Sequence, residues 1–157
     1  MRLNEILTPE CIKVPLSADC KQAALFELVD LLGETGLVTE TAQLKDAVWQ
    51  REQTRTTGIG HGIGIPHGKT DCLHNLHMAI GIPPEPIEFG SIDNKPVELI
   101  ILLASPADQT GPHIQALAKI SRMLTDDAFR DAVKQAESGQ TLYDMLIQHE
   151  AELAAGA

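Results

Sequence analysis

The chain has 157 residues, a length typical of one domain that buries about 70% of the surface of its unfolded form. Hydrophobic residues make up 43% and charged residues 22% of the chain, which excludes a disordered, collagen-like or low-complexity protein. Twelve Lys and Arg against 22 Asp and Glu give a formal net charge of -10, which disfavours nucleic acid and anionic membranes as partners.

The sequence shows no sign of membrane insertion, secretion or disulfide bonding. The longest strongly apolar run, residues 99–104, is far shorter than the ~20 residues of a spanning helix, and residues 1–5 lack a signal-peptide core. Cys11, Cys20 and Cys72 are odd in number and have no Cys-x-x-Cys spacing, so neither a disulfide framework nor a structural zinc site is indicated. We therefore expect a cytoplasmic protein with no direct membrane insertion.

Two helices are predicted before a glycine-rich segment. Ser17 can cap a helix whose apolar residues follow the 3.6-residue period, and Gly33 and Gly36 can end it. Thr39 can cap a second helix that runs toward Arg51 and loses its pattern soon afterwards. The second helix therefore leads directly into the glycine-rich segment.

Four short segments are consistent with strands: residues 12–16, 63–66, 77–82 and 97–105. The last is an unbroken apolar run, which is typical of a central strand buried on both faces. Strands interspersed with helices predict a single-domain α/β fold.

After Pro106 the pattern changes to helices. The first has an apolar stripe predicted to face the core, formed by Ile114, Leu117, Ala118, Ser121 and Leu124. Thr125 can cap a further helix, and Thr141 can start a last one. We expect the domain to span residues 1–150 and the tail, residues 151–157, to fray.

Residues 58–69 read GIGHGIGIPHGK, with five glycines and two histidines. Glycines allow positive φ and let backbone N–H groups approach an anion closely, although a merely tight loop has the same composition. Two nucleotide motifs fail here, because the phosphate-binding P-loop and the dinucleotide fingerprint both need a glycine where Ile63 stands. The segment is thus a candidate anion-binding loop without a nucleotide motif.

His67 lies between Pro66 and Gly68, which favour an accessible ring. With a reference pKa of about 6.5, imidazole is largely neutral at pH 7 and is a nucleophile without an activating base. A phosphoryl group accepted by His67 would need cations and N–H donors around its oxygens, but no metal. The candidate phosphate-binding residues of the loop are Gly64, Gly68 and Lys69.

His113 and Arg51 are weaker candidates. His113 follows Pro112 at a predicted helix start, where free N–H groups and the helix dipole favour a phosphate, but such a histidine is more often a surface or capping residue. Arg51 could pair with phosphate oxygens, but an arginine there more often complements the helix C-terminus. The residues alone leave both roles open.

A metal site is a further hypothesis, because His61, His67, His74 and His77 lie close together in the sequence. No His-Glu-x-x-His motif or Cys pair accompanies them, and on one strand His74 and His77 would point to opposite sides. We expect no metal and no cofactor, and we interpret His149 as a solvated residue of the last helix.

Taken in order, these motifs resemble the enzyme IIA component of the bacterial phosphoenolpyruvate-dependent phosphotransferase system, of the fructose, mannitol and nitrogen-regulatory type. The resemblance covers residues 3–147 and is most specific in five elements: Arg51, GIGHGIGIPHGK, IDNKPV at 92–97, PADQT at 106–110, and His113. It implies a mixed β-sheet with α-helices on both faces.

The resemblance also implies residue roles and partners. His67 would be phosphorylated on a ring nitrogen by the phosphocarrier HPr or its nitrogen-branch equivalent. His113 would be the second site histidine, which orients the phosphoryl group, and Arg51 would be the site arginine. The next partner would be a IIB domain or a regulatory target protein.

The nitrogen-regulatory type is the closest resemblance, in residues 93–97 and 106–110, and a chain with one domain and no membrane component favours a free-standing protein. Two alternatives remain: a sugar-transport IIA of the fructose and mannitol class that donates phosphate to a IIB domain, and a protein-binding module independent of phosphorylation. His61 departs from the small or polar residue expected there. The acidic net charge predicts partners with a basic docking face.

Overall fold

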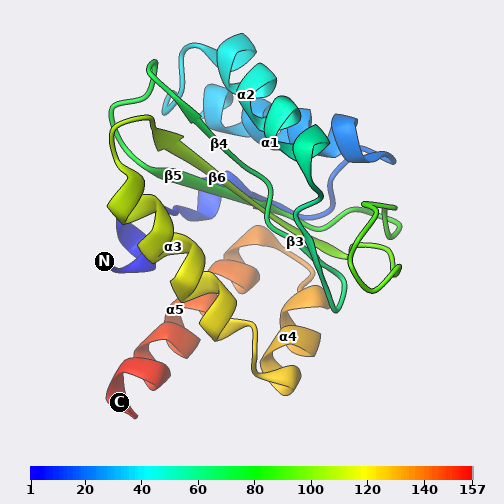
Figure 1. The fold of residues 1–157 in the computed structure, drawn as a ribbon. Coiled ribbons are helices and arrows are strands. Elements are labelled where there is room, and N and C mark those ends of the chain that lie inside the picture. The colour runs from blue at the N-terminus through cyan, green and yellow to red at the C-terminus, as the bar shows by residue number, and fades with distance from the viewer. Residues whose placement is uncertain (157) are drawn as a thin grey trace.

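In the computed structural model, which describes residues 1–156, the strand β6 (Leu99–Pro106) forms the centre of a mixed sheet (Figure 1). All its residues are buried, as the apolar run predicts. On one side it pairs antiparallel with β5 (His77–Gly81), and beyond β5 lies β1 (Ile12–Lys13). On the other side it pairs in parallel with β3 (Ile63–Gly64) and then with β4 (His67–Thr70), while β2 (Gly58–Gly60) pairs antiparallel with β3.

Helices cover both faces of this sheet, which confirms the predicted fold class (Figure 1). One face carries α1 (Lys21–Glu34) and α2 (Thr41–Thr54). The other carries α3 (Thr110–Met123), α4 (Asp127–Lys134) and α5 (Gly139–Ala155). Two 3₁₀ turns, η1 (Leu3–Glu5) and η2 (Pro9–Cys11), precede β1 and pack against α5. No helix within residues 1–156 is long and apolar enough to cross a bilayer.

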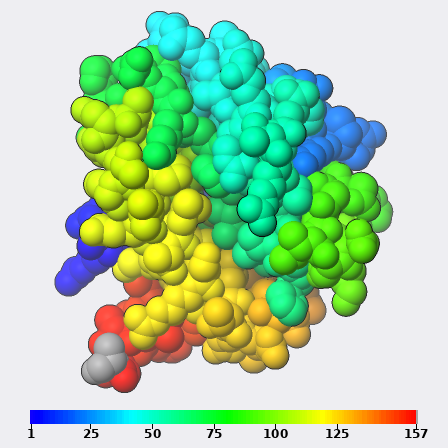
Figure 2. Space-filling model, in the orientation of Figure 1, coloured from blue at the N-terminus to red at the C-terminus, as the bar shows by residue number. Residues whose placement is uncertain are grey.

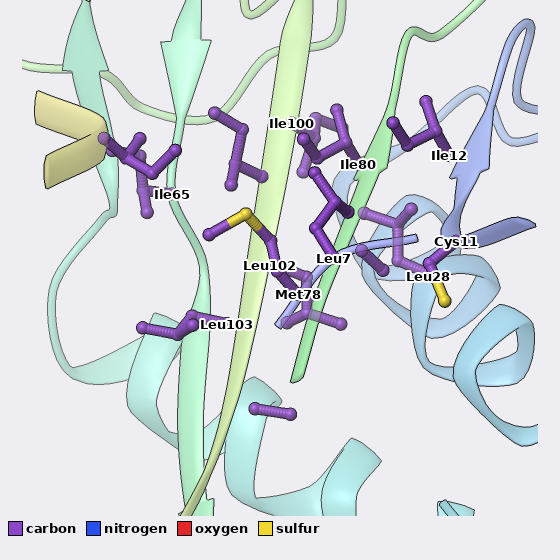
Figure 3. Packing of buried hydrophobic residues seen from close by; sticks show 14 of the residues in the cluster. Leu7, Cys11, Ile12, Leu28, Ile65, Met78, Ile80, Ile100, Leu102 and Leu103 are labelled. Carbon is purple, nitrogen blue, oxygen red and sulfur yellow. The ribbon is translucent and has the colours of Figure 1, made fainter. Parts of the chain in front are cut away.

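A cluster of buried apolar side chains packs the helices against the sheet (Figure 3). Figure 3 shows Ile80 of β5 and Leu102 of β6 at the centre, together with Leu28 of α1 and Cys11. Cys11 is fully buried and free, so it acts as a small apolar residue, as the sequence suggests. The core therefore fixes β5 and β6 as the rigid base of the sheet.

The glycine-rich segment 58–69, interpreted as a loop apart from the predicted strand 63–66, forms three strands, β2, β3 and β4. Strand β3 covers the first two residues of that predicted strand. Its first part is a hairpin whose turn needs positive φ at Gly60 (95°), His61 (58°) and Gly62 (78°). Two of its other glycines allow close packing: a Cβ on Gly58 would lie 2.1 Å from Ser91 Oγ, and one on Gly64 would lie 2.8 Å from a ring carbon of Phe89. Glycine is required here for the turn and for packing.

Two N-terminal helix caps differ from the prediction. Ser17 does not cap α1, because its N–H donates to the Glu27 carboxylate (2.9 and 3.0 Å) and Cys20 is the N-cap. Glu40, rather than Thr39, is the N-cap of α2. Strand β1 covers only the first two residues of the predicted strand 12–16.

Two later caps are also shifted, each toward a residue whose side chain accepts a helix N–H. Asp126, rather than Thr125, caps α4 by accepting from Phe129 N (3.1 Å). Ser138 caps α5 by accepting from Thr141 N (3.1 Å), so Thr141 lies inside the helix that it was predicted to start.

The predicted core stripe of α3 is only partly correct. Ile114 is 59% exposed, and Ala118 and Ser121 are also exposed. The buried residues of the helix are His113, Ala116, Ile120 and Met123. Leu117 packs against the core and Leu124, directly after the helix, is buried, as predicted. Either of two faces of this helix could pack against the core, judging by its apolar residues alone. The helix begins at Thr110, three residues before His113, and the burial of His113 selects the face.

The C-terminal prediction is corrected as well. Helix α5 continues to Ala155, and Leu153 packs against the core, so residues 151–155 extend the helix instead of fraying. Ala157, the last residue of the expected tail, lies outside the described residues. His149 is buried rather than solvated, with its ring stacked on that of Phe129 at a centroid distance of 3.8 Å.

Gly64→Ala should lower the free energy of unfolding by about 1–3 kcal/mol, because the new Cβ would press against the buried Phe89 ring. Gly111→Ala in α3 is the matched control: its Cβ meets nothing within 4 Å, and the change should leave stability unchanged or raise it by up to about 1 kcal/mol. Urea denaturation followed by circular dichroism measures both. Equal unfolding free energies for Gly64→Ala and the wild type would contradict the packing role.

Candidate functional site

His67 and His113 meet between β4 and α3. Their ring centroids lie 5.2 Å apart with an interplanar angle of 66°. The parallel register pairs His67 with Leu103 and Lys69 with Ser105, so these side chains project from the same face of the sheet. That face is the one covered by α3, because His113 contacts Ser105. The structure therefore brings together two residues that are far apart in the sequence.

The His67 ring has a defined proton position. Its Nδ1 lies 3.0 Å from the carbonyl oxygen of Ile65. Because a carbonyl oxygen only accepts, this hydrogen bond places the N–H on Nδ1 and leaves Nε2 of the neutral ring unprotonated. Burial lowers the pKa of His67, and the nearby charges of Arg51 and Lys69 lower it further. His67 is thus a neutral imidazole at pH 7 with a free lone pair on Nε2.

His113 is more strongly perturbed. It is only 4% exposed, and its Nδ1 lies 2.5 Å from Ser105 Oγ. Burial is the main reason that its pKa falls to about 4, with smaller contributions from the positive charges of His67, Lys69 and Arg51. Both rings are therefore uncharged at neutral pH.

Two cations flank His67 in an open pocket of about 450 Å³. The pocket is lined by residues of α2 (Ala47, Gln50, Arg51 and Thr54) and of β4 (His67, Gly68 and Lys69). Arg51 Nη1 donates to the Arg55 carbonyl oxygen (2.9 Å), so it complements the end of α2 and lines the pocket as well. Lys69 Nζ donates to Thr110 Oγ1 (3.4 Å) at the first residue of α3. In Figure 2 the surfaces of α2 (cyan) and α3 (yellow) lie side by side on one face.

Gly68 explains how α2 can lie so close to His67. A Cβ on Gly68 would lie 2.9 Å from Val48 Cγ2 and 3.0 Å from Val48 N. Because alternate residues of a strand face opposite sides, β4 points Gly68 at α2 and its neighbours His67 and Lys69 away from it. Glycine here allows the helix that carries Arg51 to lie directly against the strand.

Gly64 and the hairpin turn are not part of this pocket. Gly64 pairs with Gly58 and Ile100 inside the sheet. At the turn, the anion that the backbone binds is the chain's own Asp93, whose Oδ2 accepts from His61 N (2.9 Å). Backbone N–H groups of His61 and Lys95 lower the pKa of this carboxyl. The anion-binding geometry expected of the glycines thus serves the fold at the turn.

His61 lies apart from the two histidines. It is exposed at the hairpin tip, where its carbonyl oxygen accepts from Lys134 Nζ, and it lines a separate pocket with Glu98 and Arg130. Within residues 1–156, no three side chains of His, Cys, Asp or Glu converge as the ligands of a metal ion would.

A buried carboxylate beside Arg51 was not found from the sequence. Glu52 is 4% exposed and accepts from Thr57 N (2.8 Å), from Thr57 Oγ1 (2.5 Å) and from Lys21 Nζ (2.7 Å). Lys21 also donates to the Phe89 carbonyl oxygen (2.8 Å). This network fixes the end of α2 relative to β2. The sequence gives no signal for it, because Lys21 and Phe89 lie more than 30 residues from Glu52 along the chain.

Lys69→Gln should raise the pKa of His113 above about 4, because it removes a positive charge that opposes protonation of the ring. Lys45→Gln, which removes a surface ammonium paired with Asp30, is the matched control and should leave that pKa unchanged. Histidine NMR titration measures both. An unchanged His113 pKa in Lys69→Gln would contradict the proposed electrostatic coupling.

The same pKa gives the direction of a stability change with pH. The unfolded chain binds this proton with a pKa of about 6.5, above that of the folded state. The contribution of neutral His113 to stability is therefore complete above pH 6.5 and is lost as the pH falls toward about 4.

Comparison with known proteins agrees with this arrangement. Residues 5–149 match the family described as "Phosphoenolpyruvate-dependent sugar phosphotransferase system, EIIA 2". A fructose-specific EIIA component from Haloferax volcanii is 36% identical over 90% of this chain and 93% of its own length. A nitrogen regulatory protein from Bradyrhizobium diazoefficiens is 33% identical over 93% of this chain and 95% of its own.

Solved structures and longer relatives extend the comparison. The crystal structure of the nitrogen regulatory protein IIA-Ntr from Neisseria meningitidis superposes with a TM-score of 0.83 and 27% identity, over 92% of this chain and 98% of that one. A fructose-specific EIIABC component of Bacillus subtilis is 31% identical over 96% of this chain, but the chain spans only 24% of its length. The chain therefore belongs to the EIIA type 2 family of the phosphoenolpyruvate-dependent sugar phosphotransferase system.

Proposed function

We propose that the chain is a phosphoryl carrier of this phosphotransferase system, acting in the cytoplasm, and that His67 accepts the phosphoryl group from an HPr-like phosphocarrier. The observation that supports this role is the hydrogen bond from His67 Nδ1 to the Ile65 carbonyl oxygen (3.0 Å). It leaves Nε2 of a neutral ring as the nucleophile, in an open pocket with two cations. This arrangement meets the needs of phosphoryl transfer without a metal.

In the forward step, the Nε2 lone pair of His67 attacks the phosphorus of the donor's phosphohistidine. The P–N bond to the donor breaks as the bond to Nε2 forms, and the donor ring, protonated on its other nitrogen, leaves as a neutral imidazole with the electron pair. The proton on His67 Nδ1 stays in its hydrogen bond to Ile65. Because the phosphorylated ring keeps this proton, Nε2 is a good leaving group when the next acceptor attacks.

The pocket supplies charge to match the group that arrives. A phosphoryl group adds about -1.5 to -2 charges, and Arg51 and Lys69 line the pocket with His67 and can offset them. The guanidinium of Arg51 can form paired hydrogen bonds to two phosphoryl oxygens. The ammonium of Lys69 acts as a point charge near the start of α3. His113, whose ring lies 5.2 Å from that of His67, orients the group.

His67→Ala should abolish phosphorylation by phosphoenolpyruvate, enzyme I and HPr, because no other residue of the pocket offers a free imidazole nitrogen to the donor. Intact-mass analysis should show a gain of about 80 Da in the wild type, for one acid-labile phosphoryl group, and none in the variant.

His61→Ala, which removes an exposed histidine from another pocket, is the control and should be labelled like the wild type. His113→Ala should still be labelled but should pass the group on more slowly. Equal labelling of His67→Ala and the wild type would refute the assignment.

We further propose that the carrier is of the nitrogen-regulatory type, with a regulatory target protein as its partner. Relatives named nitrogen regulatory protein support this reading over nearly their whole length. The 36% identity to a fructose-specific EIIA component favours a second candidate, a sugar-transport IIA that donates to a IIB domain. The two candidates share the chemistry at His67 and differ in the protein that docks beside it.

The two candidates differ in one measurable transfer. We expect the phosphorylated chain to keep its phosphoryl group when mixed with a purified IIB domain of a fructose system, because in-line transfer needs a docking surface that brings the two reacting atoms within about 3–3.5 Å. Mass analysis over time measures the group on each protein, with HPr as the positive control for reversible transfer. Rapid phosphorylation of the IIB domain would instead establish the sugar-transport reading.

A further inference from the structure

Ser105 is a polar residue in the otherwise apolar strand β6. It is 0% exposed, and its Oγ lies 2.5 Å from Nδ1 of the buried His113. Within residues 1–156, its hydroxyl has no other hydrogen-bond partner. An apolar residue would satisfy the packing of this strand, so the hydroxyl at this position calls for a separate explanation.

The hydrogen bond has a direction. A hydroxyl can donate or accept, and so can a neutral imidazole, depending on its tautomer. If His113 donated from Nδ1, the Ser105 O–H would be left buried without an acceptor, which is unfavourable. If Ser105 donates, both groups are satisfied. The satisfied arrangement makes Nδ1 of His113 the acceptor, and the neutral ring then carries its proton on Nε2.

The position of Ser105 links this tautomer to His67. The register of β4 against β6 pairs Ser105 with Lys69 and places it on the same face as His67. The His113 ring is thus fixed through Nδ1 on the β6 side while it approaches the His67 ring at 5.2 Å. The two rings have opposite tautomers: His67 has its lone pair on Nε2, and His113 has its proton there.

We propose that Ser105 is a positioning residue that fixes His113 as the Nε2–H tautomer, so that His113 donates a hydrogen bond to a phosphoryl oxygen on His67. The role in transfer rests on the proposed function, whereas the tautomer does not. With the other tautomer, His113 would direct a lone pair at the phosphoryl oxygens and repel them. Ser105 thereby selects the form of His113 that can stabilise the transferring group.

The tautomer is tested first on the protein without partners. ¹⁵N NMR of histidine-labelled protein at pH 7 distinguishes Nδ1–H from Nε2–H rings, and it reports His67 in the same spectrum. We expect Nε2–H for His113 in the wild type and a mixture of tautomers in Ser105→Ala. Ser105→Thr, which keeps the hydroxyl, should restore the Nε2–H form. Ser91→Ala is the matched control, because it removes a buried hydroxyl that lacks a partner, away from the site.

The consequence for transfer is tested second. Ser105→Ala should still be phosphorylated on His67, but phosphoryl exchange with HPr should slow by about tenfold, the effect of one lost hydrogen bond. Ser105→Thr should recover most of the rate, and Ser91→Ala should match the wild type.

Three results would overturn the proposal: an Nδ1–H tautomer for His113 in the wild type, an unchanged tautomer in Ser105→Ala, or an unchanged exchange rate in that variant. Absence of phosphorylation of wild-type His67 would instead overturn the proposed function, and with it the role of Ser105 in transfer, whatever tautomer the NMR spectrum shows.

Discussion

The parallel pairing of β4 with β6 is the constraint on which the site depends. Its register aligns His67 with Leu103 and Lys69 with Ser105, so one face of a short strand carries His67, the proposed nucleophile, and a cation. Gly68, between them, lets α2 pack directly on the opposite face, and α2 brings Arg51 to the same pocket. A shift of this register by one residue would turn His67 toward α2 and destroy the arrangement.

The electrostatics of the pocket oppose those of the whole chain. The formal net charge is -10, yet Arg51 and Lys69 line the pocket of His67, and their charges help to keep both histidines neutral. A neutral nucleophile between two cations is suited to a group that arrives with about -2 charges, since the incoming charge is balanced without a proton having to leave first. The acidic remainder of the surface can attract a basic partner without weakening this local balance.

The sequence predicted the elements whose pattern is local. Spacing along the chain was enough to predict β6, from its apolar run, and α1, from its periodic apolar residues. The exact buried face of α3 could not be predicted, because its apolar residues allow two orientations. The choice depends on the hydrogen bond between Ser105 and His113, which lets His113 be buried. The burial of Glu52 could not be predicted for the same reason, because it depends on the tertiary contacts of Glu52 with Lys21 and Thr57.

In the glycine-rich segment, the glycines of the hairpin serve the fold, whereas Gly68 and Lys69 line the pocket with His67. The glycines were interpreted as a cradle for phosphate, but the turn binds Asp93, and Gly64 makes room for Phe89. The hairpin thus serves the site indirectly, by leading the chain from the end of α2 into β4 at the correct register. In the proposed function, the groups for phosphoryl transfer lie around His67, so the choice of partner depends on the surface beside it. Ile114, which is 59% exposed, adds an apolar side chain to the surface of α3 next to His113.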